Sequence, residues 1–195
     1  MDFRNYTDVP LGIKNNNVGN IKNFNSNFYT GQVGNDAKGH AIFKDMVFGV
    51  EAFSNDVLYK LFGRSPLLNT IEKLVNVYAP SSDGNDTNSY INYLVQKTNI
   101  GRNETIQKNK TDLLNLLNAI AAMEVGAKYL KMIPSSDLTN GYNKTFKKYA
   151  IGAGGAGMTA ANELKDAGMN PVIVEKMPVA GGHTDKYTAG MNVSD

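Results

Sequence analysis

The sequence contains no cysteine and only two histidines, His40 and His183, among its 195 residues. The chain therefore forms no disulfide bond and no thiolate metal site, and it has no cysteine nucleophile. Two isolated histidines disfavour a zinc site or a Ser/His/Asp triad, so we predict no metal ion. Either histidine could still act alone as an acid or a base.

Long apolar runs and dense positive charge are also missing. No run approaches the roughly 20 apolar residues of a membrane helix, and the first ten residues, MDFRNYTDVP, lack a hydrophobic signal core. The formal net charge of +2 comes from scattered lysines, so no patch predicts nucleic acid or an anionic membrane as a partner. We expect a chain made in the cytoplasm, with association with a virion as an alternative destination.

Apolar spacing predicts a mostly helical first part. Asn and Gly dominate residues 12–29 and favour irregular backbone held by Asn side chains. Helical periodicity follows, and Asp86 and Thr87 are suited to cap one of the helices. The expected helices cover residues 48–62, 67–78 and 88–98, and a long apolar segment, LLNLLNAIAAMEVGAKYL, that opens at Thr111 or Asp112.

The sequence changes character from residue 133 onward. Residues 133–148 are polar and predict a linker or a domain coda. After them the sequence predicts a strand, a glycine turn, a helix over 156–167 and a second strand over 171–175. The fold class is therefore α+β overall: a mostly α-helical domain over residues 1–132, then an incomplete Rossmann-like β-α-β segment over 149–195.

The glycines after the first of these strands have the spacing of a dinucleotide-binding turn. Gly152, Gly154 and Gly157 form G-x-G-x-x-G, which permits a tight turn, close approach of a pyrophosphate and close packing of helix on strand. Glu175 follows about 20 residues later, where a carboxylate can bond a ribose hydroxyl. The alternative is a glycine-rich turn with a structural role only.

The residues GAGGAGMTAANELKDAGMNPVIVEKMPVAGGHT, followed by AGMN, resemble the start of the flavoprotein subunit of the fumarate reductase and succinate dehydrogenase family. The resemblance implies FAD as cofactor, with an incomplete pocket, and a truncated, chimeric chain. Gly152, Gly154, Gly155 and Gly157 would face the pyrophosphate, Glu175 and Lys176 the adenosine ribose, and Gly181, Gly182 and Thr184 the flavin. His183 departs from the family pattern, which usually has Asn or Ser there.

Residues 11–142 resemble a different family. GIKNNNVGNIK, the Tyr78-Ala79-Pro80 step, NDTNSYI and the Glu124-Val125-Gly126 ending occur in the order found in a bacteriophage and prophage virion structural protein domain. The Asn-rich phrase also looks distantly like lysozyme-like glucosaminidases. These resemblances imply a lysozyme-like domain whose partners are bacterial peptidoglycan or other virion proteins. Val18 and Met123 depart from the usual proline and histidine.

Glu124 is the candidate proton donor for glycan hydrolysis, because it interrupts an apolar helix and burial would raise its pKa. The alternative is a glutamate on the exposed stripe of that helix. Asn15, Asn16, Asn17 and Asn20 could bind sugar groups or tie their own loop together. The main prediction is a virion-associated protein that binds peptidoglycan. Hydrolysis of the bound peptidoglycan is an additional activity within that prediction. The alternatives are a fragment of an FAD-dependent oxidoreductase and a phage structural protein without enzymatic activity.

Overall fold

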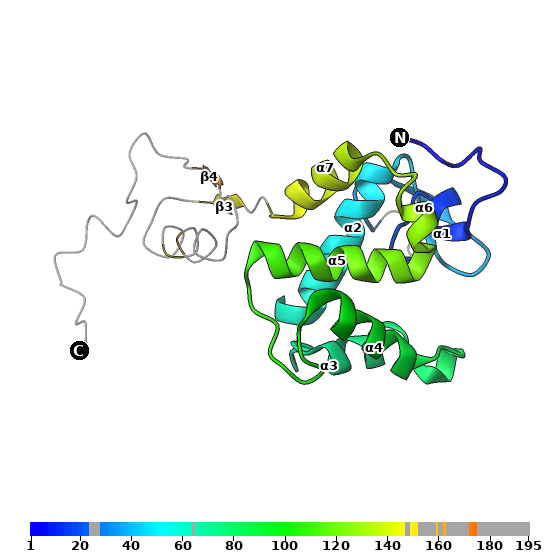
Figure 1. Cartoon of the computed structure of the whole chain (residues 1–195). Coiled ribbons are helices and arrows are strands. Elements are labelled where there is room, and N and C mark those ends of the chain that lie inside the picture. Colours follow the sequence, from blue (N-terminus) through cyan, green and yellow to red (C-terminus); the bar gives the residue numbers. More distant parts are fainter. Residues whose placement is uncertain are drawn as a thin grey trace, which may run out of the picture. The chain divides into compact units, whose positions relative to one another are not determined.

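The computed structural model describes residues 1–23, 28–63 and 65–146 and, in the remainder, the backbone of 149–151 and 172–174 together with Thr159 and Asn162. The chain divides into two compact units, Met1–Thr145 (unit 1) and Phe146–Asp195 (unit 2). In Figure 1 the colours follow the chain from its N-terminus to its C-terminus.

Unit 1 is mostly helical with a small antiparallel sheet. The short strands pair so that Gln32 lies opposite Phe43 and Asn35 opposite Ala41. No helix in the described residues combines the length and the apolar character needed to cross a bilayer. The elements are α1 (Leu11–Lys14), β1 (Gln32–Asn35), β2 (Ala41–Phe43), α2 (Met46–Leu58), the π-helical turn η1 (Tyr59–Gly63), α3 (Ile71–Tyr78), the 3-10 turn η2 (Ser81–Asp83), α4 (Thr87–Thr98), α5 (Lys110–Val125), α6 (Ala127–Leu130) and α7 (Ser135–Phe146).

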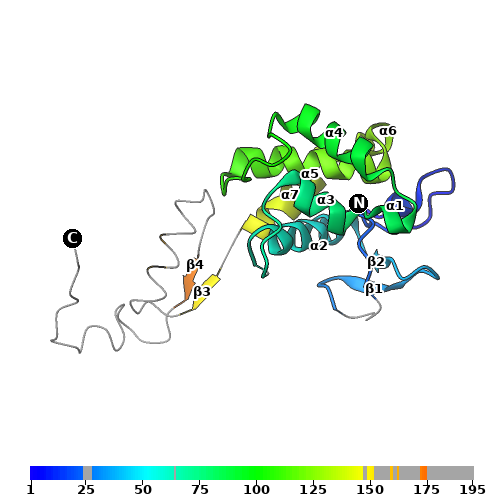
Figure 2. The same cartoon turned by 90° about the horizontal axis from the view of Figure 1, so that it is seen from below.

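The helix α5 forms the centre of the core. Leu113, Leu116, Leu117, Ile120 and Ala121 are all buried, which gives the helix an apolar surface around much of its circumference. It contacts α4, α6 and α1, and Figures 1 and 2 both show it lying beside α4. The end of α5 is therefore fixed by neighbours on several sides, and Glu124 lies at that end.

Side-chain caps set where the helices begin. Asp86 accepts a hydrogen bond from Ser89 N and opens α4, as the sequence predicted. Thr70 accepts from Lys73 N, so α3 begins at Ile71 and is shorter than expected. Asn109, not Thr111 or Asp112, caps α5. Gly126, with φ +84°, ends that helix before the residues expected to continue it.

A helix, α7, occupies most of residues 133–148, whose polar composition favoured a linker or a coda. Pro134 precedes its first turn, where a missing N–H costs nothing. Tyr142 and Phe146 are 4% and 1% exposed, so two aromatic rings one turn apart anchor an otherwise polar helix. Gly141 lets α7 approach α2, because a Cβ there would lie 2.5 Å from Val50 Cβ.

The Asn-rich loop (residues 15–20) is irregular, as the sequence predicted, and is bonded to the sheet. Asn17 Nδ2 donates to the carbonyls of Ile21 and Ala41 at 2.9 Å, and its Oδ1 accepts from Ile21 N at 3.0 Å. Asn16 Nδ2 donates to Phe43 O at 3.0 Å. Asn16 and Asn20 have φ of +51° and +47°, a conformation that Asn tolerates better than most residues. These bonds hold the loop against β2.

Two glycines bring the Asn-rich loop against other parts of unit 1. A Cβ on Gly49 of α2 would lie 1.7 Å from Asn16 O, and one on Gly19 would lie 2.1 Å from the ring of Phe53. Both distances are far below a van der Waals contact. The loop therefore packs directly against α2, and neither glycine position has room for a side chain.

In unit 2 the described backbone forms a parallel strand pair. β3 (Tyr149–Ile151) pairs with β4 (Val172–Val174), with Tyr149 opposite Val172 and Ile151 opposite Val174. Both strands match the predicted positions, and Thr159 and Asn162 between them are helical. The rest of the predicted helix over 156–167 lies outside the described residues.

Gly49→Ala is predicted to destabilise unit 1. The new methyl group overlaps Asn16 O, and both the helix and the loop are held by other bonds, so we expect a loss of about 1–3 kcal/mol in the free energy of unfolding. Urea denaturation followed by far-UV circular dichroism measures it. Gly34→Ala is the control, because none of the described residues lies within 4 Å of a Cβ there. Equal stability of the two variants would contradict the close contact.

Candidate functional site

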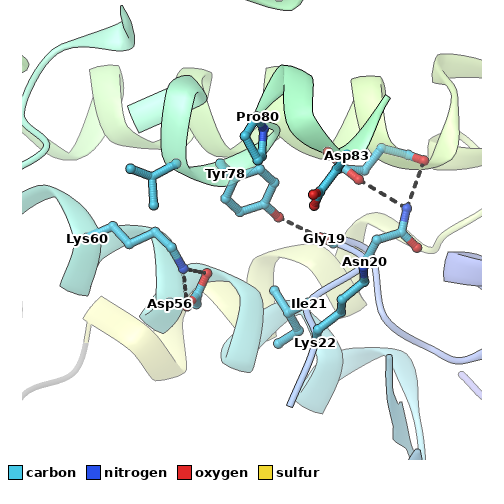
Figure 3. A pocket seen from close by; sticks show the side chains of 11 residues that line it. Gly19, Asn20, Ile21, Lys22, Asp56, Lys60, Tyr78, Pro80 and Asp83 are labelled. Atoms are coloured by element: carbon cyan, nitrogen blue, oxygen red, sulfur yellow. Dashed lines mark hydrogen bonds and ion pairs between the residues drawn. The ribbon is translucent and has the colours of Figure 1, made fainter. Parts of the chain in front are cut away.

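A cavity of about 280 Å³ lies where the Asn-rich loop, α2, η1, the end of α3 and the end of α5 meet. Its volume is near the lower end of small-molecule pockets, about 300 Å³. Figure 3 shows side chains from several of these segments turned toward one another. The lining residues are Gly19, Asn20, Ile21, Lys22, Asp56, Lys60, Val77, Tyr78, Pro80, Asp83 and Glu124.

Glu124 is held on both of its carboxylate oxygens. Tyr90 Oη donates to Oε1 at 2.9 Å, and Asn20 Nδ2 donates to Oε2 and to the backbone carbonyl of Glu124, both at 3.1 Å. Burial raises the pKa of Glu124, although the bonds from Asn20 and Tyr90 and the charge of His40 oppose the rise. Glu124 is partly buried and its pKa is shifted upward, as predicted, so an exposed position on the helix is excluded.

The geometry suits a proton donor. An ionised carboxylate offers about four lone-pair positions, and two of them are used by Asn20 and Tyr90. A carboxyl group with a raised pKa keeps its proton closer to neutral pH and can deliver it to a ligand oxygen in the cavity. Whether Glu124 performs catalysis stays a prediction.

Tyr78 and Tyr90 both lie close to Glu124, in different settings. Tyr90 is 5% exposed and is packed in the core, with its hydroxyl bonded to Glu124. Tyr78 faces the cavity, and its hydroxyl donates to Gly19 O at 2.5 Å. Burial, then the charge of Glu124, raises the pKa of both phenols well above the usual value, so both stay neutral.

The other wall of the cavity contains an ion pair that was not predicted from the sequence. Lys60 Nζ lies 2.5 Å from both carboxylate oxygens of Asp56 and 5.7 Å from the centroid of the Tyr78 ring. Figure 3 shows this pair on one side of Tyr78, and Asn20 and Asp83 on the other. An i,i+4 pair of charges is usually solvated on a helix face. No signal in the sequence separated Asp56 and Lys60 from such a pair.

The four asparagines differ in the groups that they bond. Asn16 and Asn17 tie their loop to the protein backbone, as the structural alternative proposed. Asn15 Nδ2 donates to Asp36 at 2.9 Å. Only Asn20, among these four, lines the cavity. The loop therefore works as a scaffold that presents one amide to Glu124.

His40 is paired with a carboxylate. Its Nδ1 lies 2.9 Å from Asp36 Oδ2. Burial pushes the pKa of Asp36 up, but the amides of His40 and Lys38, with the side chains of Asn15 and His40, bring it below the usual value. The other histidine, His183, lies outside the described residues. Within the described part of the chain, no three His, Asp or Glu side chains form a metal-binding cluster.

The predicted cofactor residues all lie outside the described residues. They are Gly152, Gly154, Gly155, Gly157, Glu175, Lys176, Gly181, Gly182 and Thr184. The strands that lead to them are described: β3 ends at Ile151, directly before Gly152 in the sequence, and β4 ends at Val174, directly before Glu175. Because Ile151 pairs with Val174 in a parallel register, the chain leaves both strands at the same edge. That edge is where ligands bind in parallel α/β sheets.

Comparison with known proteins bears on this part of the chain. Residues 150–195 match the FAD binding domain family. The chain is also similar to a protein named NADH:fumarate oxidoreductase from Klebsiella pneumoniae (strain 342), with 46% identity over 52 residues. The aligned segment is 27% of this chain and 6% of that relative, so the chain spans only a small part of the relative's length. The FAD-binding resemblance is thereby supported, and the lysozyme-like resemblance of unit 1 has no support from these comparisons.

Tyr90→Phe is predicted to raise the pKa of Glu124 further. The hydroxyl of Tyr90 bonds the ionised carboxylate and lowers its pKa, so removing the hydroxyl destabilises the charged form. Carbon NMR titration of the glutamate carboxyl groups measures the change. Tyr93→Phe, on the same helix, is the control, since only Tyr90 of the two donates to Glu124.

The raised pKa also fixes a sign for stability. Folded Glu124 binds its proton more tightly than the unfolded chain does, so its stabilising contribution is full below the unfolded value near 4.5 and is lost as the pH rises through the folded value. The free energy of unfolding of Glu124→Gln should not show this loss, because the amide does not titrate. If the unaltered protein instead became more stable relative to Glu124→Gln as the pH rose from the unfolded to the folded pKa, the raised pKa of Glu124 would be contradicted.

Proposed function

We propose that residues 150–195 bind the adenosine and pyrophosphate part of FAD, as the first segment of a flavoprotein domain of the fumarate reductase type. The observation that carries the proposal is the match of these residues to the FAD binding domain family. The parallel register of β3 and β4 supports it, because the glycine motif and Glu175 follow the two strands at one sheet edge.

The residues of the motif have distinct roles in this proposal. The backbone N–H groups of the turn formed by Gly152, Gly154, Gly155 and Gly157 would face the pyrophosphate. Glu175 would bond the adenosine ribose. Lys176 would lie with Glu175 at the adenosine ribose, and Gly181, Gly182 and Thr184 would extend the site toward the flavin. FAD, when bound, supplies hydride and electron transfer; the chain's own part is to bind and orient the dinucleotide.

Gly154→Val is predicted to weaken FAD binding by roughly tenfold or more, because a branched side chain would keep the pyrophosphate off the backbone N–H groups. Titration of the whole chain with FAD, followed by flavin fluorescence, measures the affinity, and ADP should compete. Gly168→Ala, outside the glycine motif, is the matched control. Absence of saturable FAD binding by the unaltered chain would sink this proposal.

A second function is favoured by the setting of Glu124. We propose that unit 1 binds bacterial peptidoglycan glycan in the cavity and cleaves it, with Glu124 as the proton donor. The support is a carboxyl group with a raised pKa in a polar cavity beside Asn20 and Tyr78. Amides and a tyrosine ring are suited to sugar hydroxyls and sugar faces. A phage structural role without catalysis is the competing account.

Glu124→Gln is predicted to lower sugar release from purified cell walls by about 100-fold or more while leaving binding largely intact, because the amide keeps the shape and cannot donate the acid proton. Co-sedimentation with cell walls measures binding, and assay of new reducing ends measures cleavage. Glu104→Gln, an exposed glutamate outside the cavity, is the control. Binding without cleavage by the unaltered chain would favour the structural role.

A further inference from the structure

Asp56 is a second carboxylate in the cavity that holds Glu124. The Asp56 and Lys60 side chains are only 18% and 20% exposed, and their i,i+4 pair lies on the wall of the cavity. A pair that served only to stabilise its helix could lie on any solvated face of that helix. Instead, it lies across Tyr78 from Asn20, the residue that bonds Glu124 (Figure 3).

Tyr78 lies close to both carboxylates. After burial, the charges of Glu124 and Asp56 both contribute to the raised pKa of its phenol. Its ring is fixed by the hydroxyl bond to Gly19 and has Lys60 nearby. Two carboxyl groups, those of Asp56 and Glu124, therefore line one cavity together with Tyr78.

We propose that Asp56, held by Lys60, is the general base that works opposite Glu124. This inference rests on the second proposed function, the cleavage of glycan by unit 1. The surroundings of the two groups differ: Glu124 accepts hydrogen bonds from the neutral Tyr90 and Asn20, whereas Asp56 is paired with an ammonium group. Acid and base roles in a two-carboxylate site are divided by such differences in surroundings.

The reaction follows from these roles. Glu124 gives its proton to the glycosidic oxygen as the bond from that oxygen to the anomeric carbon breaks. A water oxygen forms a new bond to the anomeric carbon, and Asp56 takes the proton that the water loses. Because the acid and the base act from opposite sides of the scissile bond, the water attacks the face opposite the leaving group, as in inverting glycosidases. The first product should therefore have the anomeric configuration opposite to that of the cleaved bond.

Lys60 is a positioning residue in this scheme. Its ammonium fixes both oxygens of Asp56 and need not contact the glycan. Lys60→Met should lower kcat with little effect on KM, because Asp56 loses the group that orients it. A purely structural pair would change stability without this split between kcat and KM.

The experiment uses the whole chain and peptide-free glycan strands from purified cell walls. Asp56→Asn is expected to lower kcat by about 100-fold or more. Asp56→Ala with added azide is expected to regain turnover and to yield a glycosyl azide, because azide attacks without needing a base. Asp8→Asn, an exposed position away from the cavity, is the control and should retain wild-type turnover.

The outcomes separate this inference from the function on which it rests. No cleavage by the unaltered chain would overturn both the proposed glycan hydrolysis and the role of Asp56. Cleavage that persists in Asp56→Asn, or products that retain the anomeric configuration, would overturn the role of Asp56 alone. Proton NMR measures the anomeric configuration of the sugar that the unaltered protein releases. This test therefore does not depend on whether a variant folds.

Discussion

The hydrogen bonds of the Asn-rich loop are the constraint on which the site of unit 1 depends. Asn17 satisfies three backbone groups from Ile21 and Ala41 inside the core, and Asn16 joins the loop to Phe43. Leaving such buried groups unpaired would cost about 1–3 kcal/mol each. The loop is thereby held against β2 and α2, and Asn20 is carried to Glu124. A carboxyl group at the end of an apolar helix thus acquires a defined partner and a defined cavity.

Several features of the fold follow from local chemistry and were predictable from the sequence. Asp86 opens α4 at the expected residue, and the strands around the glycine motif lie where their apolar runs placed them. The irregular Asn-rich loop and the upward shift of the Glu124 pKa also agree with the sequence-based predictions. The cap of α4 joins residues near in sequence, and Glu124 is a polar residue near the end of an apolar helix, so both are visible in local patterns.

Other features depend on contacts between distant segments, which a single sequence does not encode in a readable pattern. The helix α7 buries Tyr142 in unit 1, although its composition is polar. Asp56 and Lys60 look like a solvated pair until the fold brings α2 beside the Asn-rich loop. The cap of α5 is Asn109, whereas the sequence predicted Thr111 or Asp112. All three residue types are suited to capping, so the sequence alone did not distinguish them.

The most direct test of this account is the pKa of Glu124 in Asn17→Ala. Asn17 does not contact Glu124, but its bonds hold the loop that presents Asn20. If the loop is the support of the site, its loosening weakens the Asn20 bond that lowers the pKa, and carbon NMR should find the pKa of Glu124 higher than in the unaltered protein. A folded Asn17→Ala variant with an unchanged pKa would contradict the account.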